Sequence, residues 1–221
     1  MNSREDILSR VRARIGRATG NAAVATEAAE RWLAARQQGP RPAVAGDLLA
    51  SFREKSEALA TTVDVVDDAS AAPAAVARYL AARSLPMRAV GWPGLESQPW
   101  RDAGIVFEGR GAVDADLVGI TGCFCAIAET ATLMLLSGPD TPATVSLLPE
   151  THVAIVAASR IVPAMEDAWR LLRTEGGGLP RAVNFISGPS RTGDIEQTLV
   201  LGAHGPYRVH VVLVKAGGEN R

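Results

Sequence analysis

The chain has 221 residues, of which 47% are hydrophobic and 21% charged, a composition that favours a folded globular protein and excludes disorder over the whole length. With 23 basic and 24 acidic residues its net charge is -1, so it has no overall attraction for nucleic acid, and we expect no nucleic-acid partner. Because no apolar run approaches the roughly 18 residues of a membrane span, and two cysteines are too few for a disulfide scaffold, we expect a cytoplasmic protein without a membrane span.

The amino-terminal part of the chain predicts helices. Residues 3–15 place Ile7, Leu8 and Val11 at helical spacing. Alanine-rich stretches at 22–37 and 48–60 predict two further helices, and the intervening Gly-Pro-Arg-Pro sequence breaks the pattern. We therefore interpret residues 1–61 as an amino-terminal helical appendage to one main domain.

From Thr62 onward, expected strands and helices alternate over residues 62–216. The expected strands are 62–66, 87–91, 104–107, 116–121, 132–136, 152–156, 182–186 and 208–214, and the helices are 73–82 and 163–172. Near-continuous apolar strands separated by helices are typical of an α/β sheet buried on both faces. Since no helix separates the strands between 132 and 156, we expect a mixed, mainly parallel sheet. Glycines predict a flexible loop at 176–178 and a frayed tail at 217–221.

The usual sequence signatures of phosphate loops, dinucleotide sites, zinc proteases and serine hydrolases are missing from the sequence. The segment from Gly188 begins like a nucleophile elbow, but Thr192 stands where its last glycine would be. Cys123 and Cys125 form a C-x-C pair with no further cysteine or nearby histidine to complete a four-ligand site. We expect these thiols to pack in the interior, and we expect no metal.

The strongest local signal is the polar loop at 187–196, which directly follows an expected strand. Its hydroxyls, its glycines and the planar guanidinium of Arg191 would suit a carboxylate or phosphate. In the alternative interpretation the loop is only a capped turn, in which Arg191 pairs with Asp194 or Glu196. The ligand-binding candidates in this loop are Ser187, Gly188, Ser190, Arg191 and Thr192.

Two further segments contain candidate acid–base groups. Glu129 lies among small residues, with Thr121 and Thr130 as additional ligand-binding candidates. Burial would raise the pKa of a glutamate and suit it to general acid or base catalysis, whereas the alternative is a carboxylate bonded to loop amides. His204 lies between small residues before the last strand, where it is either a titrating catalytic group or a turn cap.

Four segments, in their order and spacing, resemble the lactate utilization protein C family and its LUD domain. They read ITGCFCAIAETAT, SLLPETHVAIV, SGPSRTGDIE and LGAHGPYRVHVVLV. The opening REDILSRVR is also similar to that family's first helix, so the resemblance covers nearly the whole chain. The sequence departs from the family pattern at 123–125, at Ala131 and at Gly193, but it keeps Glu129, Arg191 and His204.

The resemblance implies a fold similar to the ribose-phosphate isomerase, glucosamine-phosphate deaminase and CoA-transferase group. It also implies membership in a three-protein system that oxidises L-lactate to pyruvate, with iron–sulfur clusters in the two partner proteins and no cofactor in this chain. We therefore expect an accessory or anionic-metabolite-binding component. The alternatives are an independent isomerase-like or CoA-transferase-like enzyme, with Glu129 as nucleophile or base, and a regulatory metabolite-binding module; whether the chain is itself an enzyme stays open.

Overall fold

The computed structural model divides the chain into two compact units, Met1–Arg41 and Pro42–Arg221. The residues that the structure describes are 3–14, 22–43, 46–175, 178–192, 200–202 and 204–215. The frayed tail expected at 217–221 and most of the glycine loop expected at 176–178 lie outside these residues.

The first unit contains two of the predicted helices, α1 (Ser3–Arg14) and α2 (Ala22–Ala35). Acidic residues lie in the first turn of α1 and arginines in its last turn, an order that complements the helix dipole. Within the described part of the chain, none of the helices has both the length and the apolar character that crossing a membrane requires.

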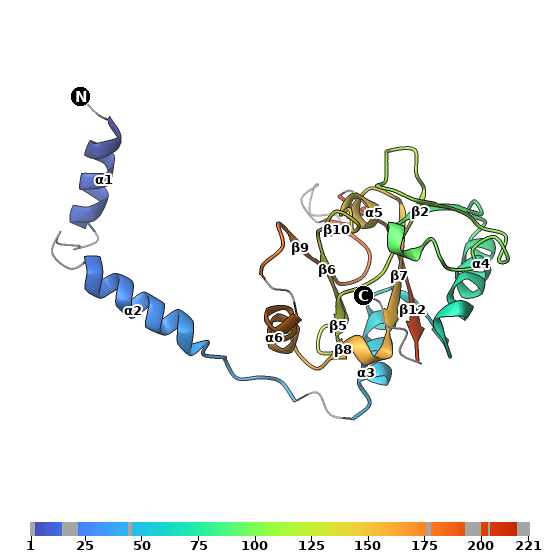
Figure 1. The fold of residues 1–221 in the computed structure, drawn as a ribbon, viewed down its shortest axis with the longest axis horizontal. Helices are drawn as coiled ribbons and strands as arrows, with labels where there is room; N and C mark the ends of the chain where they lie inside the picture. The colour runs from blue at the N-terminus through green and yellow to red at the C-terminus, as the bar shows by residue number, and fades with distance from the viewer. Residues whose placement is uncertain are drawn as a thin grey trace. The chain divides into compact units, whose positions relative to one another are not determined.

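The second unit, seen in Figure 1, contains a large sheet. This sheet has six strands, and every neighbouring pair is parallel. Its order is β1-β12-β7-β4-β2-β3. The strands are β1 (Thr62–Val66), β2 (Arg88–Gly91), β3 (Val106–Gly109), β4 (Val118–Thr121), β7 (Thr151–Ala157) and β12 (Arg208–Val214). All seven residues of β7 are buried, which explains why the sequence of this strand does not alternate between polar and apolar residues.

Antiparallel pairing occurs in a separate four-stranded sheet. Its order is β8-β5-β6-β9, with β5 and β9 antiparallel to β6 and with β8 parallel to β5. The strands are β5 (Cys125–Ile127), β6 (Thr132–Leu136), β8 (Ile161–Val162) and β9 (Val183–Ile186). The fold is thus a mixed α/β fold, as predicted, but the mixed pairing lies in a second sheet that the sequence analysis did not separate from the first.

Several short elements were not predicted, because two to four residues are too few to establish a periodicity. They are β5, β8, α5 (Thr144–Leu147), the antiparallel pair β10 (Arg191–Thr192) and β11 (Val200–Leu201), and the 3-10 turns η1 (Ala69–Ala71), η2 (Pro93–Leu95) and η3 (Ala158–Arg160).

One face of the six-stranded sheet is covered by helix α4 (Ala72–Ala82). Val76 and Leu80 of this helix are fully buried in one core with Ile120 and Val153 of the sheet. Figure 1 shows α4 and α6 on opposite sides of this unit. Because α4 covers only one face of the six-stranded sheet, the other face must be covered by different elements.

The second face packs against the four-stranded sheet and helix α3 (Leu48–Ala58). Phe52 of α3, Leu133 of β6 and Leu213 of β12 belong to the same buried cluster. Alternate residues of the four-stranded sheet point away from this core, where Ile127 and Met134 pack with α6 (Met165–Glu175). Both sheets are consequently buried between layers.

Helix α3 belongs to the second unit, although the sequence analysis expected it in the appendage. The side chain of Asp47 caps the helix by accepting hydrogen bonds from the backbone N–H groups of Leu49 and Ala50. Phe52 is 0% exposed in the core described above. The compact unit thus begins well before the boundary expected at Thr62, because α3 is fixed by contacts with residues distant in the sequence.

Candidate functional site

The two polar segments singled out in the sequence meet where β9 ends and β6 begins. Strands β6 and β9 are antiparallel, with Leu133 opposite Ile186, so Ser187 lies beside Thr132. The Oγ atoms of Ser187 and Thr132 are 2.6 Å apart, and the hydroxyls of Thr132 and Thr130 are 2.7 Å apart. The structure thus brings the candidates Ser187 and Thr130 together through Thr132, which was not a candidate.

The loop after β9 is held close to the backbone of two other segments. Gly188 has a φ of +77°, and a Cβ atom at this position would lie 2.8 Å from the carbonyl oxygen of Leu59. The backbone N–H of Ser190 donates to the carbonyl of Pro206 at 2.8 Å, and its carbonyl accepts from the N–H of Gly202 at 2.9 Å. These bonds tie the loop to the segment that carries His204.

Two cations, Arg191 of this loop and Lys55 of α3, donate to backbone carbonyls. The guanidinium of Arg191 donates through Nη2 to the carbonyl of Leu59 at 3.0 Å, and Nζ of Lys55 donates to the carbonyl of Glu129 at 2.9 Å. Each of these bonds uses a single N–H group, so with respect to the described part of the chain both side chains keep further donors. Asp194 and Glu196, the expected partners of Arg191 in a capped turn, lie outside the described residues.

We call this group of residues the β9-end cluster. Its members are Lys55, Glu129, Thr130, Thr132, Ser187, Gly188, Ser190 and Arg191. The cluster lies at the carboxyl end of β9, while Leu59 and Pro206, which its loop contacts, precede the amino ends of β1 and β12. Hydroxyl groups and cations are the groups that hold a small carboxylate or phosphate in proteins.

Sequence reasoning missed Lys55 because α3 was assigned to the appendage. A signal was nevertheless present in the helical spacing. Phe52, Lys55, Ser56 and Leu59 follow the i, i+3, i+4, i+7 pattern of one helix face, and Phe52 and Ser56 are buried. A lysine on the buried face of a helix is predicted to contact the rest of the domain.

The remaining candidates have other surroundings. Glu129 is half-buried, and its backbone N–H donates to the carbonyl of Pro163 at 3.0 Å. His204 is exposed in a turn. Thr192 pairs with Val200 between β10 and β11, and its side chain lies outside the described residues.

Thr121 forms a buried pair with a histidine rather than joining the hydroxyls of the β9-end cluster. Its Oγ1 is 2.8 Å from Nε2 of His152, and both side chains are 0% exposed. Burial lowers the pKa of His152 to about 4, so its ring is neutral near pH 7. Burial lowers the pKa of His210 to about 4 as well, and this ring stacks on Tyr79 with 4.0 Å between the ring centroids.

The two cysteines have different partners. The thiol of Cys123 donates to the carbonyl of Cys125 at 2.9 Å, whereas Sγ of Cys125 lies 3.7 Å from Sδ of Met134. Burial raises the pKa of Cys123 and raises that of Cys125 to about 12, so both thiols are protonated near pH 7. Among the residues that the structure describes, no group of three His, Cys, Asp or Glu side chains is arranged to hold a metal ion.

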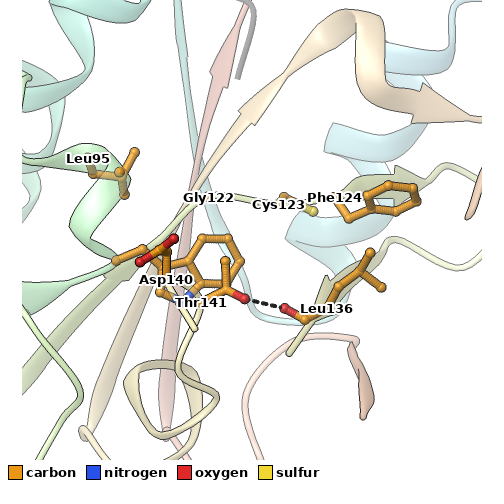
Figure 2. Close-up of a pocket in the computed structure, with 9 residues that line it drawn as sticks. Leu95, Gly122, Cys123, Phe124, Leu136, Asp140 and Thr141 are labelled. Atoms are coloured by element: carbon orange, nitrogen blue, oxygen red, sulfur yellow. Dashed lines mark hydrogen bonds between the residues drawn. The ribbon is translucent and has the colours of Figure 1, made fainter. Parts of the chain in front are cut away.

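A cavity of about 270 Å³ opens at the carboxyl ends of β2 and β4 (Figure 2). Its lining consists of Trp92, Gly94 and Leu95 after β2, Gly122, Cys123 and Phe124 after β4, and Leu136, Asp140 and Thr141. The sequence analysis placed no ligand-binding residue here. A signal existed in the Gly-Trp-Pro-Gly sequence at 91–94, since glycine and proline directly after a strand indicate a loop at the ligand-binding edge of the sheet.

Comparison with known proteins relates the second half of the chain to one domain family. Residues 109–214 match the LUD domain. Lactate utilization protein C from Exiguobacterium sp. (strain ATCC BAA-1283 / AT1b) is 47% identical over 106 residues, which are 47% of this chain and 46% of that protein. Lactate utilization protein C from Bacillus subtilis (strain 168) is 39% identical over 127 residues, 56% of this chain and 53% of that protein. The chain thus spans about half the length of the curated relatives it matches.

A solved structure supports the fold. The crystal structure of a DUF162 family protein from Deinococcus radiodurans matches with a TM-score of 0.59 and 23% identity, covering 78% of this chain and 99% of that one. At this level of identity the match bears on the architecture alone. Residues 109–214 of this chain thus match the LUD domain and are similar to the corresponding part of lactate utilization protein C.

Proposed function

We propose that this protein acts in lactate utilization, as a component of a system that oxidises L-lactate to pyruvate. In this proposal the β9-end cluster binds the carboxylate of the substrate, of the product or of a related anionic metabolite. The names of the curated relatives support the role in lactate utilization. The chemistry of the cluster supports a small anion as its ligand.

The observation that carries the proposal is the 2.6 Å contact between the hydroxyls of Thr132 and Ser187. It joins two polar segments that are 55 residues apart in the sequence, in the same cluster as the cations Lys55 and Arg191. A carboxylate binds best where hydroxyl donors and a planar guanidinium converge. The cluster supplies both kinds of donor from separate elements.

We further propose that the electrons from lactate pass to iron–sulfur partner proteins, and that this chain is the accessory, metabolite-binding member of the system. Lactate oxidation releases two electrons, which a serine, a threonine, a lysine or an arginine cannot accept. The protonated thiol of Cys123 donates to the carbonyl of Cys125, and Sγ of Cys125 lies beside Sδ of Met134. In this proposal the electron acceptors belong to the partner proteins.

Complementation with a copurification arm tests this function. The gene is expressed in a bacterium from which lactate utilization protein C has been deleted, and growth on L-lactate as the sole carbon source is measured. We expect growth to return, and we expect a tagged chain to retain iron–sulfur proteins that accept electrons in the presence of L-lactate. Absence of growth from a well-expressed chain, or turnover of an unrelated anion by the chain alone, would contradict the proposal.

A further inference from the structure

The cavity shown in Figure 2 lies at a point where the connections of the main sheet diverge. From β2 the chain continues to β3, which is the edge strand next to β2. From β4 it continues through the second sheet to β7, which lies on the other side of β4, towards the centre of the main sheet. Strands β2 and β4 are neighbours, so their two connections leave in opposite directions. In open α/β sheets ligands bind in the crevice outside the carboxyl ends of two such strands.

The walls of this cavity are mainly apolar. Figure 2 shows Leu95 and Asp140 on one side and Phe124 and Leu136 on the other. The hydroxyl of Thr141 donates to the carbonyl of Leu136 at 2.8 Å and is thereby occupied. Such walls suit the faces of a flat ring better than a hydrated ion.

Trp92 supplies an unpaired donor. Its Nε1 atom is buried, and it has no hydrogen-bond partner among the described residues. The tryptophan packs against three separate buried clusters, so its indole cannot readily turn away. The indole is therefore a fixed part of the cavity wall, and its N–H group reports on a ligand that binds beside it.

The cavity differs from the β9-end cluster in the charge of its lining residues. Asp140 contributes a carboxylate, and none of the lining residues is a lysine or an arginine. Cys123 contributes a protonated thiol because burial raises its pKa. An anion such as lactate would be repelled here, whereas a neutral or positively charged compound would not be.

We propose that this cavity is a second binding site, which takes a flat, neutral or cationic ring compound that lies beside Trp92 and carries an N–H donor for Asp140. The site is independent of the anion site proposed above. It shares no residue with the β9-end cluster, and it lies at the end of the main sheet where β2 and β4 terminate.

Three probes of nearly equal shape test the proposal: benzamide, which is neutral, benzamidine, which is cationic, and benzoate, which is anionic. Each is added at millimolar concentration to the full-length ¹⁵N-labelled protein. The chain has four tryptophans, and the indole N–H signal of Trp92 is assigned by its loss in Trp92→Phe. We expect benzamide and benzamidine to shift this signal in a saturable way and benzoate to leave it unchanged.

Two variants sharpen the test. Gly94 lines the cavity, and a Cβ atom there would meet no other atom within 4 Å, so Gly94→Leu should fold normally, fill the space and abolish both shifts. Asp140→Asn should weaken benzamidine binding by up to about fivefold and leave benzamide binding unchanged. No saturable shift with any probe, equal binding of benzoate, or unchanged binding in a folded Gly94→Leu variant would overturn the proposal. Because none of these readouts uses lactate, their failure would leave the proposed function untouched.

Discussion

At the scale of single residues, the proposed anion site depends on Arg191. We predict that Arg191→Lys lowers the affinity for lactate or pyruvate by about one to two orders of magnitude, because lysine keeps the charge but loses the planar pair of donors. The melting temperature should change little, since the side chain is exposed and donates one hydrogen bond to Leu59. Isothermal titration calorimetry and thermal melting on the same samples measure both quantities.

The matched control is Arg173→Lys, at an exposed arginine of α6. It should leave both affinity and stability unchanged. If Arg191→Lys lowers the melting temperature but not the affinity, then Arg191 is a structural residue that fastens the loop to the end of α3.

The buried histidines predict how stability depends on pH. In the unfolded chain both His152 and His210 have ordinary pKa values near 6.5, whereas burial lowers the folded pKa of each to about 4. Between these values the unfolded state binds more protons, so the contribution to stability is present above pH 6.5 and is lost as the pH falls towards 4. Between pH 7 and pH 5 we expect a loss of about 2 kcal/mol per histidine.

Urea unfolding at pH 7, 6 and 5 measures this dependence. His204 is the only other histidine of the chain and is exposed, so His204→Gln should keep the same slope of unfolding free energy against pH. If the slope disappears in His204→Gln, the pH dependence comes from His204 and not from His152 and His210, which would contradict the prediction.

At the scale of elements, the position of the loop after β9 depends on its close approach to the end of α3. We predict that Gly188→Ala destabilises the protein by about 1 to 3 kcal/mol, because alanine is strained at a φ of +77° and its Cβ would lie 2.8 Å from the Leu59 carbonyl. Anion affinity should fall as well, since the loop carries Ser190 and Arg191.

Gly104→Ala provides the comparison for this experiment. Gly104 has nearly the same φ, +76°, but a Cβ atom there would meet nothing within 4 Å. It should show only the cost of backbone strain and no loss of anion affinity. Equal destabilisation by the two substitutions would mean that the contact with α3 contributes nothing.

At the scale of the whole molecule, the boundary between the two units predicts which fragments fold. A fragment of residues 42–221 should unfold cooperatively, because it contains the whole second unit. A fragment of residues 62–221 should lose the cooperative transition, since it lacks α3 and uncovers one side of the core that contains Phe52. Removing a buried phenylalanine alone costs about 3 to 5 kcal/mol, a large part of the stability of an ordinary domain. Circular dichroism during thermal melting compares the two fragments, and equal cooperativity in both would show that α3 is dispensable.

The sequence by itself determined the type and approximate position of the longer elements. Strands such as 132–136 and 208–214 coincide with β6 and β12, because their apolar runs are long enough to define a buried strand. It also located the two polar segments around Glu129 and Ser187, since clusters of glycine and hydroxyl residues after a strand form a local pattern. These properties depend on neighbouring residues in the chain.

Only the tertiary structure decided which of these segments meet. The pairing of β6 with β9 places Thr132 against Ser187, and the packing of α3 brings Lys55 to the same cluster. Thr121 was a candidate in the sequence, but packing buries it against His152. The cavity beside Trp92 depends on β2 and β4 becoming neighbours. The physical reason is common to all four cases: hydrogen-bond register and core packing between distant segments leave no periodic trace in either segment alone.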